Sequence, residues 1–144
     1  DVIVGFPGEG EKEFAETYTL IEKAPINWLH IFPFSPRPGT PAEKLEPKVH
    51  PTEIKKRVSL LKELHQKKRK TFLKINLGKV CKTIIEEENK EYYKGLTDNY
   101  IHVFIKKKEG LLLQKGKLIQ TKLLKLMGDG VLAEPFKDNY IVKP

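Results

Sequence analysis

The sequence DVIVGFPGEGEKEF (residues 1–14) decides the fold of the first half of the chain. Its β-branched apolar run predicts a strand over residues 2–6 with sheet neighbours on both sides. The strand runs into PGEG (residues 7–10), where two glycines permit a tight turn. Apolar residues then recur at helical spacing over residues 11–23. The opening stretch therefore predicts a strand, a tight turn and a helix.

A second short strand is predicted at NWLHIF (residues 27–32), which is rich in aromatic and branched residues. Strand, helix and strand within about thirty residues form a βαβ unit with parallel pairing. Such a unit leaves both strand edges unpaired and one sheet face uncovered, so we expect residues 1–75 to be unstable or self-associating alone. We interpret them as the last βα units of a larger (β/α) barrel, truncated just before one of its late strands.

The next stretch, PFSPRPGTPAEKLEP (residues 33–47), holds five prolines and predicts a stiff surface loop. Thr52 is then the expected N-cap of a long amphipathic helix over residues 53–75. Its apolar side is predicted to cover a core, and its many Lys and Arg side chains to form a solvated face. Binding of that basic face to RNA or to a membrane surface is the weaker alternative. The apolar side comprises Ile54, Val58, Leu61, Leu64, Phe72 and Ile75.

The pattern changes from helical to strand-like near residue 77. Five strands within about sixty residues favour a small closed or nearly closed barrel, because closure hides strand edges. The predicted fold class is α/β plus β, with a first domain over residues 1–76 and a small five-stranded barrel over residues 77–144. The five segments are residues 79–87, 92–97, 100–106, 117–126 and 130–135.

Composition restricts the function. The formal net charge is +8, from 27 basic and 19 acidic residues, which favours polyanionic partners, although lysine-rich surfaces also serve solubility alone. The single cysteine, Cys81, excludes an internal disulfide and any all-protein thiolate metal site. The four histidines show no ligand spacing, so no metal is expected. A reducing, cytoplasmic setting is the default, and no apolar stretch approaches the ~20 residues that span a bilayer.

Many lysines of the barrel are interleaved with tyrosines. Lysines neutralise phosphates and exposed aromatic faces stack unpaired bases, a mixture that suits a structured RNA with a splayed loop, of which an anticodon stem-loop is one example. An alternative is that Tyr100 and Phe104 alternate with His102 and form the inward face of a strand. The candidate RNA-binding residues are Lys82, Lys94, Asn99, Tyr100, Lys106 and Lys107.

Two pairs of stretches resemble a known family. DVIVGFPGE (1–9) and LHIFPFSPRPGTPA (29–42) resemble the end of the radical S-adenosylmethionine domain of methylthiotransferases. GKVCKTIIEE (78–87) and GLTDNYIHV (95–103) are similar to their TRAM domain, an OB-like barrel that binds RNA, and are nearest to the branch acting on threonylcarbamoyladenosine in tRNA. The resemblance implies methylthiolation of a tRNA adenosine or of a ribosomal protein, with S-adenosylmethionine and two [4Fe-4S] clusters as cofactors.

The resemblance also implies roles for single positions. The strand residues Ile3, Val4 and Gly5 would lie against the adenine of the cofactor, and Pro7, Gly8 and Glu9 would form the turn after it. From the residues alone, the glycines equally well only shape a turn. Gly10 stands where the family usually has threonine, which weakens the expected helix N-cap. In the proline-rich loop, Ser35, Arg37 and Thr40 match the family, and Arg37 would either hold a phosphate or carboxylate or brace the loop.

The family binds its clusters through a CxxxCxxC loop and through further cysteines of an amino-terminal domain, whereas this chain has one cysteine. No catalytic residue is therefore expected in this piece, which we predict to be inactive alone. Two rival hypotheses remain open. One is a stand-alone RNA-binding module whose βαβ part is an oligomerisation platform, and the other is a methylthiotransferase that acts on a ribosomal protein.

Overall fold

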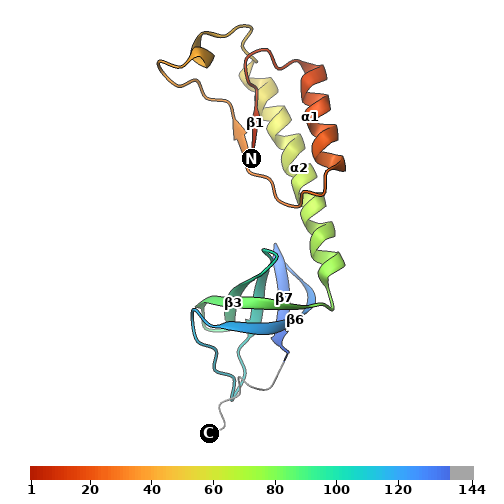
Figure 1. Cartoon of the computed structure of the whole chain (residues 1–144), viewed down its shortest axis with the longest axis vertical. Helices are drawn as coiled ribbons and strands as arrows, with labels where there is room; N and C mark the ends of the chain where they lie inside the picture. The colour runs from red at the N-terminus through yellow and green to blue at the C-terminus, as the bar shows by residue number, and fades with distance from the viewer. Residues whose placement is uncertain (137–144) are drawn as a thin grey trace. The chain divides into compact units, whose positions relative to one another are not determined.

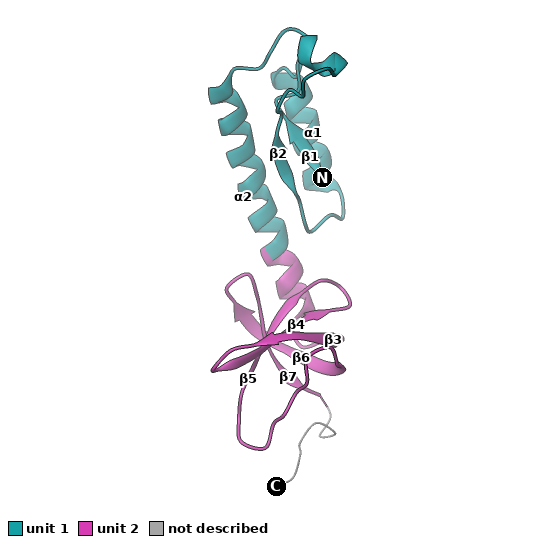
Figure 2. Ribbon diagram, turned by 90° about the vertical axis from the view of Figure 1, so that its left-hand side faces the viewer, with its two compact units in different colours: residues 1–69 teal, residues 70–144 magenta. Residues whose placement is uncertain are grey.

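The computed structural model describes residues 1–136 and divides the chain into two compact units at residues 69 and 70 (Figure 2). The division falls inside the long helix α2 (Pro51–Asn76), whereas the sequence places a domain boundary at its end. Residues 137–144, the end of the predicted second domain, lie outside the described residues. Each unit is described by itself below.

The first unit contains the predicted parallel βαβ arrangement (Figure 1). Strand β1 (Val2–Val4) is followed by helix α1 (Glu11–Lys23) and strand β2 (Ile31–Pro33). Both strands are shorter than predicted, and Ile3 pairs with Phe32 at the centre of the register. The period of two then decides the packing: Val4 enters the core, whereas Ile3 points to the opposite face and is 57% exposed.

The core of the first unit lies between one face of this small sheet and two helices. It is formed by Val4, Phe14 and Ile21 together with Leu61 and Leu64 of α2. A one-turn 3-10 helix (Pro41–Lys44) interrupts the proline-rich loop that leads to α2. Helix α2 begins at Pro51, earlier than the predicted start, because a proline in the first helical turn gives up no hydrogen bond.

Two expectations for α2 need correction. Ile75 was assigned to the apolar side but is 62% exposed, and Leu73, which was not assigned there, is 3% exposed. The basic residues also do not form one solvated face, since Arg57 and Arg69 are only 4% and 5% exposed. The lysines follow the prediction, because those of α2 are exposed apart from the partly buried Lys68.

The second unit is the predicted barrel, closed in the order β3-β4-β5-β7-β6. All neighbouring strands are antiparallel except the parallel pair β5 and β7. Alternating residues fill the interior, where the buried Thr83 and Thr121 share a hydrogen bond of 2.7 Å between their hydroxyls. The strands are β3 (Val80–Glu88), β4 (Tyr92–Thr97), β5 (His102–Lys106), β6 (Leu118–Met127) and β7 (Gly130–Pro135).

The last turn of α2 belongs to this second unit. Leu73 joins the barrel core, and Phe72 and Leu77 pack against it, so the helix end covers part of the barrel interior. Gly95 permits close strand packing, because a Cβ there would lie 2.8 Å from Cγ2 of Thr83. None of the helices within residues 1–136 is long and apolar enough to cross a membrane.

Candidate functional sites

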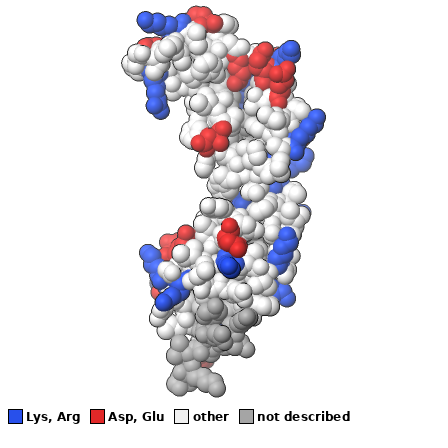
Figure 3. Space-filling view, in the orientation of Figure 1, with Lys and Arg blue, Asp and Glu red and all other residues white. Residues whose placement is uncertain are grey.

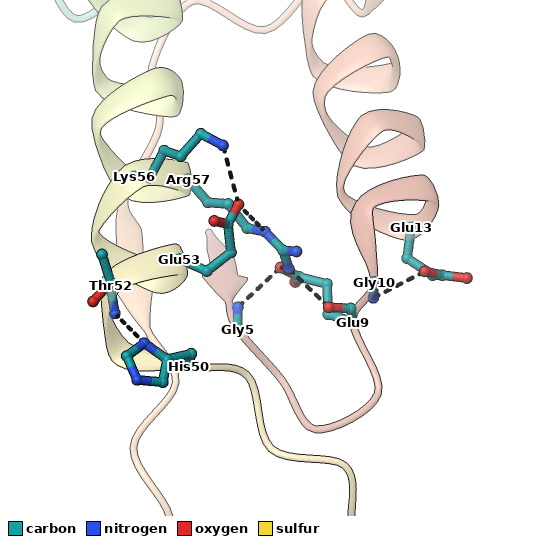
Figure 4. Close-up of polar contacts among 9 residues, drawn as sticks. All are labelled: Gly5, Glu9, Gly10, Glu13, His50, Thr52, Glu53, Lys56 and Arg57. Carbon is teal, nitrogen blue, oxygen red and sulfur yellow. Dashed lines mark hydrogen bonds and ion pairs between the residues drawn. The ribbon is translucent and has the colours of Figure 1, made fainter.

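A buried ion pair holds the turn that follows β1 (Figure 4). The Oε1 atom of Glu9 accepts a hydrogen bond from Nη1 of Arg57 at 2.6 Å and another from the Gly5 amide at 3.1 Å. The same Nη1 atom donates to the Glu9 carbonyl at 2.8 Å. One guanidinium from α2 therefore fixes both the side chain and the backbone of Glu9.

The surroundings of Arg57 explain how a charge can be buried there. Its side chain is 4% exposed and that of Glu9 is 13% exposed. A second carboxylate, from Glu53, lies 3.5 Å from Nε, and the guanidinium lies 5.3 Å from the centre of the Phe14 ring. Charge-assisted bonds and a cation–π contact replace the lost water. Sequence reasoning missed Arg57, for which the only signal is an arginine within a helix rich in lysine.

The glycines of the turn have structural reasons to be glycine. Gly5 has a φ of 82°, and a Cβ there would lie 2.6 Å from Cδ1 of Ile54. Gly8, with a φ of 87°, donates its amide hydrogen to the carbonyl of Pro47 at 2.8 Å. At Gly10, Oε2 of Glu13 accepts the amide hydrogen at 2.9 Å, so the helix start is capped without the threonine expected there.

The predicted cofactor residues divide into two groups. Val4, Gly5 and Pro7 are buried, and Glu9 is turned toward Arg57, so these residues serve the packing of the unit. Ile3 and Gly8 are exposed. Among these residues, the exposed side chain is therefore that of Ile3, on the sheet face opposite Val4.

That face is apolar. Ile3, Phe32 and Phe6 are 57%, 50% and 42% exposed, and the Phe6 ring lies edge-on to Phe34 with ring centres 5.1 Å apart. Among residues 1–136, no three His, Cys, Asp or Glu side chains are grouped so that they could hold a metal ion.

In the proline-rich loop, Ser35 and Arg37 are exposed and Thr40 is partly buried. The Thr40 hydroxyl donates to the carbonyl of Arg37 at 2.8 Å, and the Glu43 carboxylate accepts from the Gly39 amide at 2.9 Å. These bonds shape the loop without using the Arg37 guanidinium. Thr40 thus stabilises the loop conformation, whereas the Arg37 side chain projects from the loop into solvent.

On the barrel, acidic residues of β3 engage two of the predicted RNA-binding lysines. Lys94 donates to the Glu87 carboxylate at 2.7 Å, and this hydrogen bond and the lysine charge lower the pKa of Glu87. Lys107 pairs with Glu88 and lies 4.8 Å from the centre of the Tyr93 ring. Sequence reasoning passed over these acids, although the run EEE at residues 86–88 marks them.

Lys94 and Glu87 border a shallow pocket of about 240 Å³ on the outside of the barrel. His102 and Phe104 also line this pocket. The rings of Phe104 and Tyr92 meet edge-to-face with centres 6.3 Å apart, and both side chains are half-buried. On the face drawn in Figure 3, basic and acidic side chains of this unit are interspersed. Charge on this face is therefore local rather than one continuous basic patch.

The remaining predicted RNA-binding residues fall elsewhere on the barrel. Lys82 and Lys106 are exposed, whereas Asn99 is partly buried and turned inward. Tyr100 lies in the turn before β5 and is 74% exposed, which overturns the alternative that it forms the inward face of a strand. Cys81 lies in β3, partly buried beside the core, and burial raises the pKa of its thiol.

Comparison with known proteins finds homologues that carry methylthiotransferase names. The chain is 50% identical over 122 residues to the threonylcarbamoyladenosine tRNA methylthiotransferase MtaB of Aquifex aeolicus. This match covers 84% of this chain and 28% of that protein. The chain is 40% identical over 130 residues to MtaB of Bacillus subtilis, covering 87% and 28%. It is 33% identical over 120 residues to the ribosomal protein uS12 methylthiotransferase RimO of Alkaliphilus oremlandii, covering 77% and 27%.

No family model matches the chain. The similarity to these proteins nevertheless shows that the chain belongs to the methylthiotransferase family, a group of radical S-adenosylmethionine proteins. The chain spans about 28% of the length of the first two relatives.

Proposed function

We propose that this chain is part of a tRNA-modifying methylthiotransferase, in which the first unit contributes to the radical S-adenosylmethionine barrel and the second binds tRNA near the anticodon. The observation that carries the proposal is the 50% identity over 122 residues. A match of that length exceeds either compact unit, so it includes residues of both. The combination of the two units, and not the barrel alone, is thus shared with a tRNA methylthiotransferase.

Support for RNA binding comes from the chemistry of the barrel. Lysines outnumber acidic residues in residues 70–136, and an OB-like barrel carries nucleic acid on its outer strands and loops. Lys82 and Lys106 are exposed and suited to phosphate contact, as is Tyr100 to base stacking. Lys94 and Lys107 would have to leave Glu87 and Glu88, so we expect smaller contributions from them. For Asn99 we propose an indirect role, through the turn that it braces.

The first unit would form part of the cofactor wall. Ile3 would contact the adenine, while Val4, Gly5, Pro7, Gly8 and Glu9 would hold the strand and turn in shape. When bound, S-adenosylmethionine and its cluster supply radical chemistry, and the cluster ligands would come from outside this chain because it has one cysteine. We therefore propose that the chain alone is inactive.

The proline-rich loop would face the substrate. Its braced backbone presents the exposed Arg37, whose planar guanidinium can donate hydrogen bonds to two oxygens of a phosphate. Ser35 is exposed beside it, and Thr40 would act by keeping the loop in shape. A backbone phosphate of the tRNA is the ligand that this arrangement would take.

A segment exchange tests the proposal. The matched segment of the B. subtilis relative is replaced by this chain, and tRNA and ribosomal protein uS12 from cells that carry only the chimera are examined by mass spectrometry. We expect methylthiolated threonylcarbamoyladenosine in tRNA. The parent enzyme with its own segment is the positive control. Unmodified tRNA with an intact, cluster-loaded chimera would contradict the proposal, and methylthiolated uS12 would favour the ribosomal-protein alternative, for which the RimO relative gives the precedent.

A further inference from the structure

Tyr100 has a backbone conformation that a tyrosine rarely adopts. Its φ is 62°, and within residues 1–136 it is the one non-glycine residue with a positive φ. In this left-handed region a Cβ crowds the backbone, so glycine and asparagine adopt it at lower cost. The tyrosine therefore destabilises its own turn. A strained residue that the rest of the fold enforces is a reason to ask what its side chain does.

The surrounding turn is built to hold this conformation. The amides of Tyr100 and Ile101 donate to the carbonyl and hydroxyl oxygens of Thr97 at 3.0 and 2.8 Å. The Thr97 hydroxyl donates in turn to Oδ1 of Asn99 at 2.7 Å, and Nδ2 of Asn99 donates to Oδ1 of Asn76 at 3.3 Å. Asn76 is 5% exposed and is anchored to the Phe72 carbonyl of its own helix. The turn is therefore tied to the end of α2.

Most of the Tyr100 ring faces solvent. Tyr100 is 74% exposed, more than any other aromatic side chain of the described part of the chain, while the next residue, Ile101, is fully buried. The buried neighbour anchors the turn and the ring projects from it. A hydrogen bond of 2.9 Å from the Asp98 amide to the Lys82 carbonyl places the turn beside β3, where the Lys82 side chain is exposed.

We infer that Tyr100 is a pre-organised stacking platform for an unpaired base of an RNA loop, with Lys82 beside it for an adjoining phosphate. The inference rests on the proposed RNA binding and assigns it to a particular turn. A fixed aromatic face loses little freedom when a base stacks on it, and every base offers such a face. A fully paired duplex keeps its bases stacked internally and offers the ring nothing comparable.

The test combines stability with RNA affinity. Y100N removes the ring and relieves the strained backbone, whereas Y100F keeps the ring. Y92N is the matched control, because Tyr92 is a half-buried tyrosine of the same barrel outside this turn. The Tm of each variant of the whole chain is measured by heating without RNA. Affinity is then measured by titration with an RNA hairpin that has an unpaired loop, and separately with the same sequence paired into a full duplex. A 2-aminopurine in the loop reports stacking directly.

For Y100N we expect an unchanged or higher Tm, about 10-fold weaker hairpin binding and unchanged duplex binding. The salt dependence of hairpin binding should also stay unchanged, since no phosphate contact is lost. Y100F should bind like the unaltered chain. K82Q should instead lower the slope of log affinity against log salt by about one. A loss of affinity together with higher stability cannot arise from misfolding.

Two results would overturn the inference alone: Y100N that binds the hairpin as well as the unaltered chain does, or an equal loss for hairpin and duplex. A lower Tm for Y100N would also contradict it, because the turn would then need the tyrosine for stability. If the unaltered chain binds no RNA at all, both this inference and the proposed RNA binding are contradicted.

Discussion

The pair formed by Glu9 and Arg57 shows how a single residue determines the local structure. Removing one member of a buried ion pair leaves the other charge desolvated, which costs much more than an exposed pair contributes. Arg57 also gives a hydrogen bond to the Glu9 backbone, so its removal affects the turn twice. The turn after β1 thus owes its shape to a helix that follows it by more than forty residues.

We predict that Arg57→Ala lowers the free energy of unfolding of the first unit by about 3 kcal/mol. Trp28, the one tryptophan of the chain, lies in that unit and reports its unfolding in urea. Arg37→Ala is the matched control, since Arg37 is exposed and the change should stay within about 0.5 kcal/mol. Equal effects of the two substitutions would show that the buried pair has no special weight.

At the scale of elements, His65 joins α2 to the segment before β2. Its Nδ1 atom accepts a hydrogen bond from the Leu29 amide at 3.1 Å, so the neutral ring is the form that fits. Trp28 meets the His65 ring edge-on, with centres 5.1 Å apart. Burial, followed by the charges of Arg69 and His30, lowers the pKa of His65 below its ordinary value of 6.5.

This shift has a definite sign for stability. As pH falls below 6.5, the unfolded chain takes up the His65 proton before the folded chain does, so the first unit loses stability until the lowered pKa is passed. Above pH 6.5 the contribution is complete. We predict that His65→Asn, whose side-chain oxygen can still accept the Leu29 bond, flattens the decline of unfolding free energy between pH 7 and pH 5.

The control for this prediction is His50→Asn. His50 is exposed just before α2, and its ring accepts a hydrogen bond from the Thr52 amide at 3.3 Å within the same segment, so its replacement should leave the decline unchanged. Trp28 fluorescence during urea titration at several pH values gives the measurement. An unchanged pH profile in His65→Asn would show that other groups cause the acid sensitivity.

The same scale shows why some elements could be predicted from sequence and others could not. The five strands of the barrel fall within two residues of their predicted ends, because alternating burial leaves a local signal of period two. The burial of Arg57 depends on Glu9, far away in the sequence, and leaves no such signal. The left-handed Tyr100 could not be predicted either, because tyrosine does not favour that conformation.

At the scale of the whole molecule, each compact unit has its own hydrophobic core, and the closed barrel hides all its strand edges. The small parallel sheet of the first unit instead exposes Ile3 and Phe32 on one face. The resemblance predicted the family, and the comparisons confirm it. The roles of single residues in cofactor and RNA binding stay predictions, because they depend on ligands.

The most direct test of the account is the affinity of the whole chain for an anticodon stem-loop RNA, measured between 50 and 200 mM salt. If exposed lysines such as Lys82 and Lys106 neutralise about three phosphates, log affinity should fall linearly with log salt, and affinity by about 40-fold over this range. Binding that is absent, or that does not change with salt, would contradict the claim that the barrel is the tRNA-binding part of a methylthiotransferase.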